Sequence, residues 1–129
     1  QLIQNKIIPA LNHGKWVISD RFTDASFAYQ GGGRMLNLDR ITKLEEWVQG
    51  AFQPDLTFLL DVSVDIGMKR IEVRKAKDRI EQEDRAFFER VRSGFIERSK
   101  LYPERIKLID ASRSIDEVQN QIQSLLESL

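Results

Sequence analysis

Short apolar runs alternate along this chain with longer segments of helical periodicity. The runs are "WVIS" at 16–19, "PDLTFLLD" at 54–61 and "IKLID" at 106–110. Runs of this length, without strict apolar–polar alternation, are typical of strands buried on both faces of a sheet. Strands that alternate with helices form a parallel sheet through right-handed crossovers. The sequence therefore predicts a single α/β domain over residues 1–129.

Helices are predicted in the segments around these strands. Apolar residues at helical spacing favour helices over 2–11, 22–30, 39–52, 63–73, 87–101 and 114–125. Asp39, Ser63 and Ser114 are the candidate N-caps of three of them. Pro103 is expected to end the long helix before it, because proline cannot continue a helix.

Polar residues follow each predicted strand. Ser19-Asp20-Arg21 follows the first, and Asp61 and Asp110 end the other two. Because the carboxyl ends of parallel strands share one edge of the sheet, these side chains are expected to lie near one another. Ligands of such sheets bind beyond that edge.

Three consecutive glycines, Gly31, Gly32 and Gly33, allow two interpretations. They could cradle a phosphate, but the phosphate-binding motif G-x-x-x-x-G-K-[ST] lies between a strand and a helix, and its spacing is absent here. The other interpretation is a plain helix stop with a flexible connector, which is the commoner use of such glycines.

The pair Asp20-Arg21 also has two interpretations. An arginine at the end of a buried strand can clamp a phosphate through paired donors, and the adjacent aspartate can orient a metal-bound water. Alternatively, the pair closes a strand–helix turn as a simple ion pair.

Cationic side chains are concentrated between residues 69 and 79. They are Lys69, Arg70, Arg74, Lys75, Lys77 and Arg79. A cluster of this kind is most often a solvated helix end. Cations on a mobile segment are also what phosphoryl transfer uses to neutralise the transferring group.

The overall composition excludes several classes of protein. Basic and acidic residues both number 20, so the net charge gives no indication of nucleic acid or a membrane surface as partner. The chain has no cysteine, which excludes disulfides and thiolate metal sites. We interpret the single histidine, His13, as structural. No leader and no membrane-length apolar run is visible, so we expect a cytoplasmic protein.

Taken together, several stretches resemble the bacterial thymidylate kinases. They are "PAL", "GKWVISDRF", "SFAYQGGGR", "QPDLTFLLDV", "DRIEQE" with "FF" after it, and "IDAS", in the order and spacing of that family. "AYQGGGR" and "DRIEQE" are the most specific, and the resemblance covers essentially the whole chain. It implies a P-loop NTPase-type fold, with three α/β/α layers around a parallel sheet.

The resemblance implies roles for the segment around Asp20. Arg21 corresponds to the arginine that grips the phosphate of thymidine monophosphate (dTMP), with Asp20 beside it at the metal and phosphate centre. The positions that surround the thymine and sugar are Phe22, Ser26, Tyr29 and Gln30. No direct metal ligand is implied in this chain, although Asp20 could act through a water.

The resemblance also implies how ATP is held. Residues 70–83 correspond to a lid in which Arg74 is the catalytic arginine and Arg70 and Arg79 support it. The loop that passes the adenine corresponds to Asp110, Ala111, Ser112 and Arg113. The reaction implied is ATP plus dTMP giving ADP plus thymidine diphosphate, with Mg²⁺ as cofactor. A homodimer is implied as well.

One part of the family pattern has no counterpart in these residues. The phosphate loop and its strand are absent, and the resemblance places that strand between the strands at 16–19 and 56–61. We therefore expect the C-terminal part of a kinase, which alone neither hydrolyses ATP nor folds stably, because unpaired interior strand edges are costly.

Two alternatives stay open at this point. One is another P-loop nucleoside or nucleotide kinase with a different acceptor. The other is a non-catalytic fragment or binding subunit without a phosphate loop. A G-x-x-x-x-G-K-[ST] motif in the complete reading frame would dismiss the second.

Overall fold

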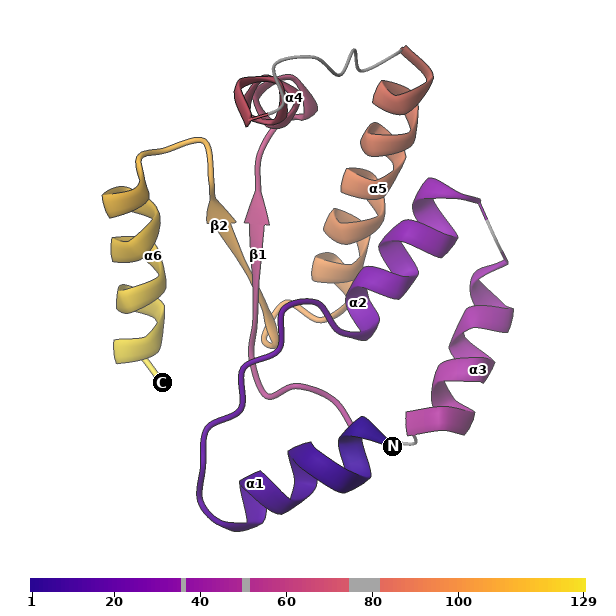
Figure 1. The fold of residues 1–129 in the computed structure, drawn as a ribbon, viewed down its shortest axis with the longest axis vertical. Coiled ribbons are helices and arrows are strands. Elements are labelled where there is room, and N and C mark those ends of the chain that lie inside the picture. The colour runs from indigo at the N-terminus through magenta and orange to yellow at the C-terminus, as the bar shows by residue number, and fades with distance from the viewer. Residues whose placement is uncertain (36, 50–51, 75–81) are drawn as a thin grey trace.

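The computed structural model describes residues 1–35, 37–49, 52–74 and 82–129 (Figure 1). Its elements, in chain order, are the π-helical η1 (Ile3–Ile7), α1 (Ile8–Asn12), α2 (Thr23–Ser26), the π-helical η2 (Phe27–Gly33), α3 (Leu38–Gln49), β1 (Thr57–Asp61), α4 (Val64–Arg74), α5 (Gln82–Leu101), β2 (Ile106–Asp110) and α6 (Ile115–Glu127). Within the described residues, no helix combines the length and the apolar character needed to cross a membrane.

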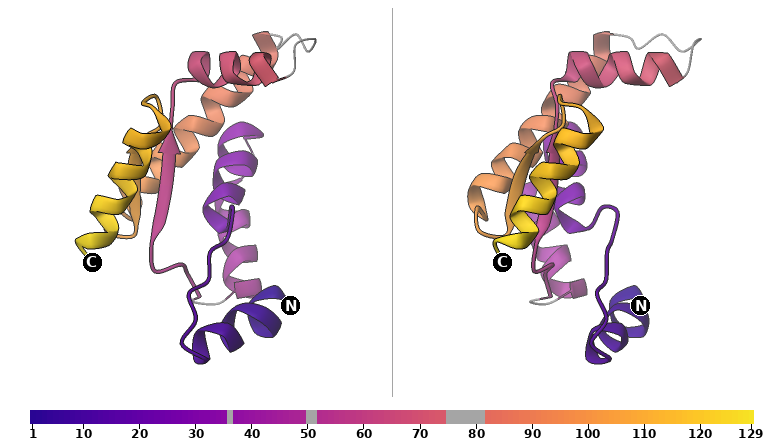
Figure 2. Two further views of the ribbon diagram at one scale, coloured as in Figure 1. Left: turned by 60° about the vertical axis from the view of Figure 1, so that its left-hand side comes forward. Right: turned by 90° about the vertical axis from the view of Figure 1, so that its left-hand side faces the viewer.

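The sheet consists of β1 and β2, which pair in parallel. Thr57 lies opposite Ile106 at the amino end, and Asp61 lies opposite Asp110 at the carboxyl end. The connection between the strands includes α4 and α5, as a parallel pair requires. Helices α5 and α6 flank the strands on opposite sides (Figures 1 and 2). The parallel α/β arrangement predicted for these two segments is confirmed.

The strand predicted at residues 16–19 does not form. This segment has no sheet pairing with any described residue, and two of its side chains, Trp16 and Ile18, are 83% and 94% exposed. A strand exists only through ladder hydrogen bonds to a neighbour. The prediction failed because the apolar run has the composition of a strand but no partner strand in the described part of the chain.

The glycine run does not stop the second helix. The α2 helix continues as η2 through Gly33, and η2 packs along α5. A Cβ on Gly32 would lie 2.7 Å from the carbonyl oxygen of Arg90, and one on Gly94 would lie 2.9 Å from the Cα of Ala28. The interpretation as a plain helix stop with a flexible connector is therefore wrong, since Gly32 and Gly94 instead allow two helix backbones to approach closely.

Helix ends follow the sequence with one exception. Ser63 and Ser114 accept hydrogen bonds from the backbone N–H groups three residues later, as N-caps do. The α3 helix is capped by Asn37, whose Oδ1 accepts from the N–H of Asp39 at 2.9 Å. The predicted cap, Asp39, lies two residues after Asn37, in the first turn of α3, where its charge suits the positive end of the helix dipole.

The core lies mainly between η2, α5 and the sheet. Its buried apolar residues are Ile7, Phe27, Ala28, Val64, Val91, Ile106 and Ile109. Ile109 of β2 is fully buried. This core fixes the position of α2, which follows Arg21, and the carboxyl ends of β1 and β2, which carry Asp61 and Asp110.

Candidate functional site

The carboxyl edge of the sheet brings two predicted residues together. Asp61 and Asp110 are direct partners in the strand register. The Asp61 carboxylate accepts two hydrogen bonds from Arg92 of α5, at 2.9 and 3.2 Å. This bidentate contact raises the pKa of the Arg92 guanidinium. Asp61 is therefore engaged in fixing α5 to the sheet.

The loop after β2 is ordered by its own side chains. Asp110 Oδ1 accepts from the Ser112 hydroxyl and from the Ser112 backbone N–H, and Oδ2 accepts from Arg113 Nε at 3.3 Å. The Ser112 hydroxyl bond is the main cause of the lowered pKa of the Asp110 carboxyl. The loop predicted to pass the adenine is thus a compact turn in which Asp110 keeps its negative charge.

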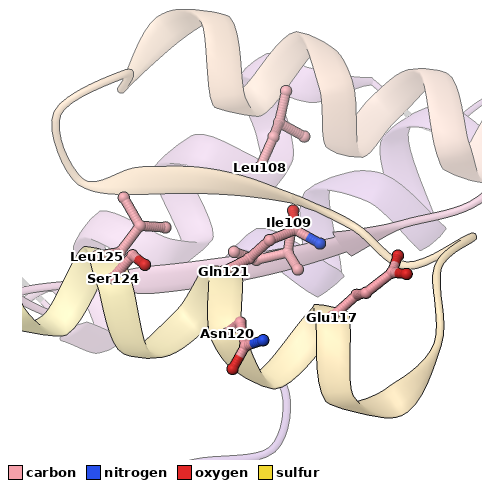
Figure 3. Close-up of a pocket in the computed structure, with 7 residues that line it drawn as sticks. All are labelled: Leu108, Ile109, Glu117, Asn120, Gln121, Ser124 and Leu125. Atoms are coloured by element: carbon pink, nitrogen blue, oxygen red, sulfur yellow. The ribbon is translucent and has the colours of Figure 1, made fainter.

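The backbone of the same loop is held from two sides. Gln121 of α6 accepts from the Asp110 N–H at 2.9 Å and donates to the Asp110 carbonyl at 3.0 Å. The Ala111 N–H donates to the Asp61 carbonyl at 2.8 Å. An open groove of about 480 Å³ runs beside Gln121 between α6 and β2 (Figure 3), lined by Leu108, Ile109, Glu117, Asn120, Gln121, Ser124 and Leu125. The Gln121 amide occupies the edge of β2 that another strand would otherwise pair with.

A second cluster lies around Arg21, directly before α2. Arg21 Nη2 donates to the Tyr29 hydroxyl at 3.4 Å, and its guanidinium lies 5.0 Å from the centroid of the Tyr29 ring. The ring of Tyr29 also contacts Phe87 and Phe95 of α5, with centroids 6.2 and 6.0 Å away. The structure thus places two of the predicted acceptor residues, Arg21 and Tyr29, in contact. Helix α5 supports the Tyr29 ring through its side chains Phe87 and Phe95.

The other predicted acceptor residues occupy the same segment. Phe22 packs edge-on against Phe52, with ring centroids 6.4 Å apart. Gln30 accepts a hydrogen bond from Arg34 at 3.3 Å, and Ser26, one helical turn earlier, is exposed. Asp20 is also exposed. Among the described contacts of Arg21 and of Asp110, none joins the two clusters directly.

The lid prediction falls partly outside the described residues. Arg70 is an exposed residue of α4, the helix that begins just beyond the carboxyl end of β1 (Figure 1). Arg74 is the last residue of that helix. Arg79 and the rest of 75–81 lie outside the described residues.

The sequence reading missed a buried ionic cluster centred on Asp24. This carboxylate is only 6% exposed and bonds Arg98 Nε at 2.8 Å and two nitrogens of Arg105 at 2.7 and 3.0 Å. Burial by itself raises the pKa of Asp24, but the hydrogen bonds from Arg105 and Arg98 outweigh it and the net shift is downward. The carboxylate therefore remains ionised although it is buried.

One sequence signal could have found Asp24. It stands three and four residues before Phe27 and Ala28, so helical spacing places it on their apolar face. A carboxylate on such a face needs a buried partner. The partners themselves, 74 and 81 residues further along, follow no spacing rule.

Comparisons with known proteins agree with these features. A family model described as Thymidylate kinase matches residues 1–122. Proteins named Thymidylate kinase from Ruthia magnifica and Vesicomyosocius okutanii are 60% and 61% identical to this chain, each over 98% of it. One of the same name from Nitrosospira multiformis is 52% identical over 95% of the chain. The chain spans 60–62% of the length of these relatives.

Proposed function

Because this chain belongs to the thymidylate kinase family, we propose that the protein containing it transfers a phosphoryl group from ATP to dTMP. The products are ADP and thymidine diphosphate. The single structural observation that best supports this function is the contact between Arg21 and Tyr29 at the start of the acceptor segment. Arg21 is an exposed residue, and a planar guanidinium held against an aromatic ring suits the capture of a nucleotide phosphate.

The acceptor is proposed to lie along α2 and η2. Arg21 binds its phosphate, and Phe22 and Tyr29 line the pocket, with Tyr29 near the sugar. Ser26 and Gln30 are four residues apart and so share one helix face, where a hydroxyl and an amide can satisfy the polar edge of thymine. Arg34 donates a hydrogen bond to the side-chain oxygen of Gln30 and so keeps the Gln30 amide oriented.

The donor is proposed to lie beyond the carboxyl edge of the sheet. The turn at Asp110, Ala111, Ser112 and Arg113 passes the adenine, and its rigidity comes from Ser112 and Gln121. Arg74 neutralises charge on the transferring phosphoryl group, with Arg70 and Arg79 in support. Phosphoryl transfer asks little more of a protein than positioning and neutralisation of charge.

Mg²⁺ is the proposed cofactor. Within the described residues, no group of three or more potential ligand side chains is placed to hold a metal ion. Mg²⁺ keeps several waters and is usually bound by one or two carboxylates together with substrate phosphates. Asp20 is exposed beside Arg21 and is suited to such a contact through water. When bound, the ion would supply charge neutralisation between the phosphates.

The whole protein is proposed to have a three-layer P-loop fold, with the phosphate-loop strand between residues 16–19 and β1. The exposure of Trp16 and Ile18 supports this arrangement, because these side chains have the composition of a buried strand. We further propose a cytoplasmic homodimer on family resemblance.

The test is a substrate panel on the complete reading frame that contains these residues. Formation of ADP is measured with ATP, Mg²⁺ and each of dTMP, dUMP, dCMP, dGMP and dAMP. The proposal expects the highest kcat/KM with dTMP. Preference for another acceptor would assign the protein to a different nucleotide kinase activity, and the absence of acceptor-dependent ADP formation would indicate a non-catalytic role.

A further inference from the structure

The buried cluster of Asp24, Arg98 and Arg105 joins parts of the chain that are far apart in sequence. Arg98 belongs to α5, and Arg105 lies directly before β2. Arg105 also donates to the Thr57 hydroxyl at the start of β1, at 3.3 Å. Asp24 therefore fastens the short helix α2 to α5 and to the amino ends of both strands.

Aromatic rings complete the enclosure of this cluster. The Arg98 guanidinium lies 3.8 Å from the centroid of Phe27, and Tyr102 covers both arginines at 4.8 and 4.9 Å. The side chains of Asp24, Arg98 and Arg105 are 9%, 9% and 14% exposed. Ionic bonds in a site with so little water hold their geometry closely, because water cannot replace them.

The residue three positions before Asp24 has an unfavourable backbone. Arg21 has a φ of +66°, in the left-handed region that non-glycine residues rarely adopt. Such a conformation persists only when the surrounding structure enforces it. Near Arg21, the Ser19 hydroxyl donates to the Arg21 carbonyl at 2.9 Å, and the Ala25 N–H donates to the Phe22 carbonyl at 3.2 Å.

These local bonds lie within one short segment, whereas Asp24 connects that segment to the core. We propose that Asp24, through Arg98 and Arg105, is a positioning residue that holds α2 so that Arg21 keeps its left-handed backbone and faces the acceptor phosphate. The inference rests on the proposed function and adds to it a determinant of acceptor affinity that touches no substrate.

The consequence is a selective effect on the acceptor. If α2 is released from Arg98 and Arg105, Arg21 can relax to an ordinary backbone and its guanidinium moves relative to the phosphate. The adenine loop is held by Ser112, Gln121 and the Asp61 carbonyl, and these groups make no contact with Asp24. The affinity for ATP is therefore unaffected.

The experiment uses steady-state kinetics on the complete protein with Asp24→Asn. The amide keeps the shape of the side chain but loses the charge that pairs with both arginines. The KM for dTMP is expected to rise about tenfold to a hundredfold, the cost typical of a small misplacement of a binding group. The KM for ATP is expected to stay within twofold of the wild-type value.

Two further variants separate positioning from folding. Arg105→Lys keeps the cluster charged but cannot bond both oxygens of Asp24, so it is expected to raise the KM for dTMP by an intermediate factor. Ile106→Ala weakens the buried amino end of β2 without removing any ionic bond. It is expected to lower the melting temperature and leave both KM values unchanged.

The outcomes are distinct. A rise in the KM for dTMP in Asp24→Asn or Arg105→Lys, without a rise in Ile106→Ala, supports the proposal. If Asp24→Asn does not fold, Arg105→Lys decides alone. Unchanged KM values with a smaller fraction of active enzyme would overturn the positioning role while leaving the kinase function intact. A wild-type protein that does not phosphorylate dTMP would overturn the proposed function, and this inference with it.

Discussion

Arg21 is the residue whose geometry is most specific to its proposed task. Its guanidinium contacts Tyr29, and its backbone has φ +66°. Replacement by lysine keeps the positive charge but removes the planar pair of donors that suits a phosphate. Charged hydrogen bonds contribute about 1.5–3 kcal/mol each, so Arg21→Lys is expected to lower kcat/KM for dTMP about tenfold to a hundredfold.

The matched control for Arg21 is an exposed arginine elsewhere on the surface. Arg40 is exposed on α3, and Arg40→Lys is expected to leave kcat/KM unchanged. Steady-state assays of both variants with saturating ATP check the prediction. Equal kcat/KM values for the two variants would remove Arg21 from the acceptor site.

Asp24 makes the free energy of unfolding depend on pH in the acid range. Its folded-state pKa lies below the ordinary value of 3.8. The ionised carboxylate therefore contributes stability that is fully present above that ordinary value and is lost as the pH falls through the lower folded-state value. The free energy of unfolding is expected to decline as the pH is lowered from about 5 towards 2.

The Asp24→Asn variant isolates this contribution. It is expected to be less stable at neutral pH and to show a weaker decline on acidification, measured by urea unfolding of the complete protein across that range. Asp110 also has a lowered pKa, so Asp110→Asn is the control that should keep the Asp24 part of the decline. A decline in Asp24→Asn as steep as in the wild type would contradict the assignment.

At the scale of elements, the contact between η2 and α5 depends on the absence of side chains. In Gly94→Ala the new methyl group would lie 2.9 Å from the Cα and 3.2 Å from the carbonyl oxygen of Ala28, both backbone atoms. The helices would have to separate, and overpacking of this kind costs about 1–3 kcal/mol. Gly94→Ala is expected to lower the free energy of unfolding by this cost less the roughly 0.5–1 kcal/mol that alanine gains over glycine within a helix.

Gly67 offers a control of the same chemistry. It lies within α4, and a methyl group there would meet only Val62 Cγ1 at an ordinary 3.7 Å. Alanine is favoured over glycine in a helix interior by about 0.5–1 kcal/mol, so Gly67→Ala is expected to be neutral or stabilising. Urea unfolding of both variants compares the two. Destabilisation of both to the same extent would show that helix packing is not the cause.

The elements that the sequence predicted well are those determined by local chemistry. β2 was expected at residues 106–110 and is found there, and Ser114 caps α6 as its capping-box pattern indicated. Arg21 and Tyr29 were singled out and lie together. The failures depend on contacts between distant segments. The glycines pack against α5, where Gly33 contacts Arg90, 57 residues further along the chain. Residues 16–19 have no strand partner among the residues that the structure describes.

At the scale of the whole molecule, the accessible surface is large for the mass. The chain exposes 10036 Å², whereas a compact monomer of 15.0 kDa exposes about 7,000 Å². Part of the excess is apolar: besides Trp16 and Ile18, the strand residues Leu60 and Leu108 are 54% and 52% exposed. A surface of this kind is typical of a chain that packs against further protein.

Residues 1–129 expressed alone are therefore expected to form an aggregated or molten state. A two-stranded sheet buries too little surface to offset the entropy of ordering the chain. The edge of β1 that has no strand partner in the described part of the chain also invites pairing between molecules. Near-UV circular dichroism and amide hydrogen exchange on the isolated segment test this expectation, with the complete reading frame as the control. The isolated segment should show no fixed tertiary signal and little protection in β1, whereas the complete protein should unfold cooperatively. A sharp cooperative melt of residues 1–129 would show instead that η2, α5 and β2 form a core sufficient for folding, and that the excess surface is a property of the native domain.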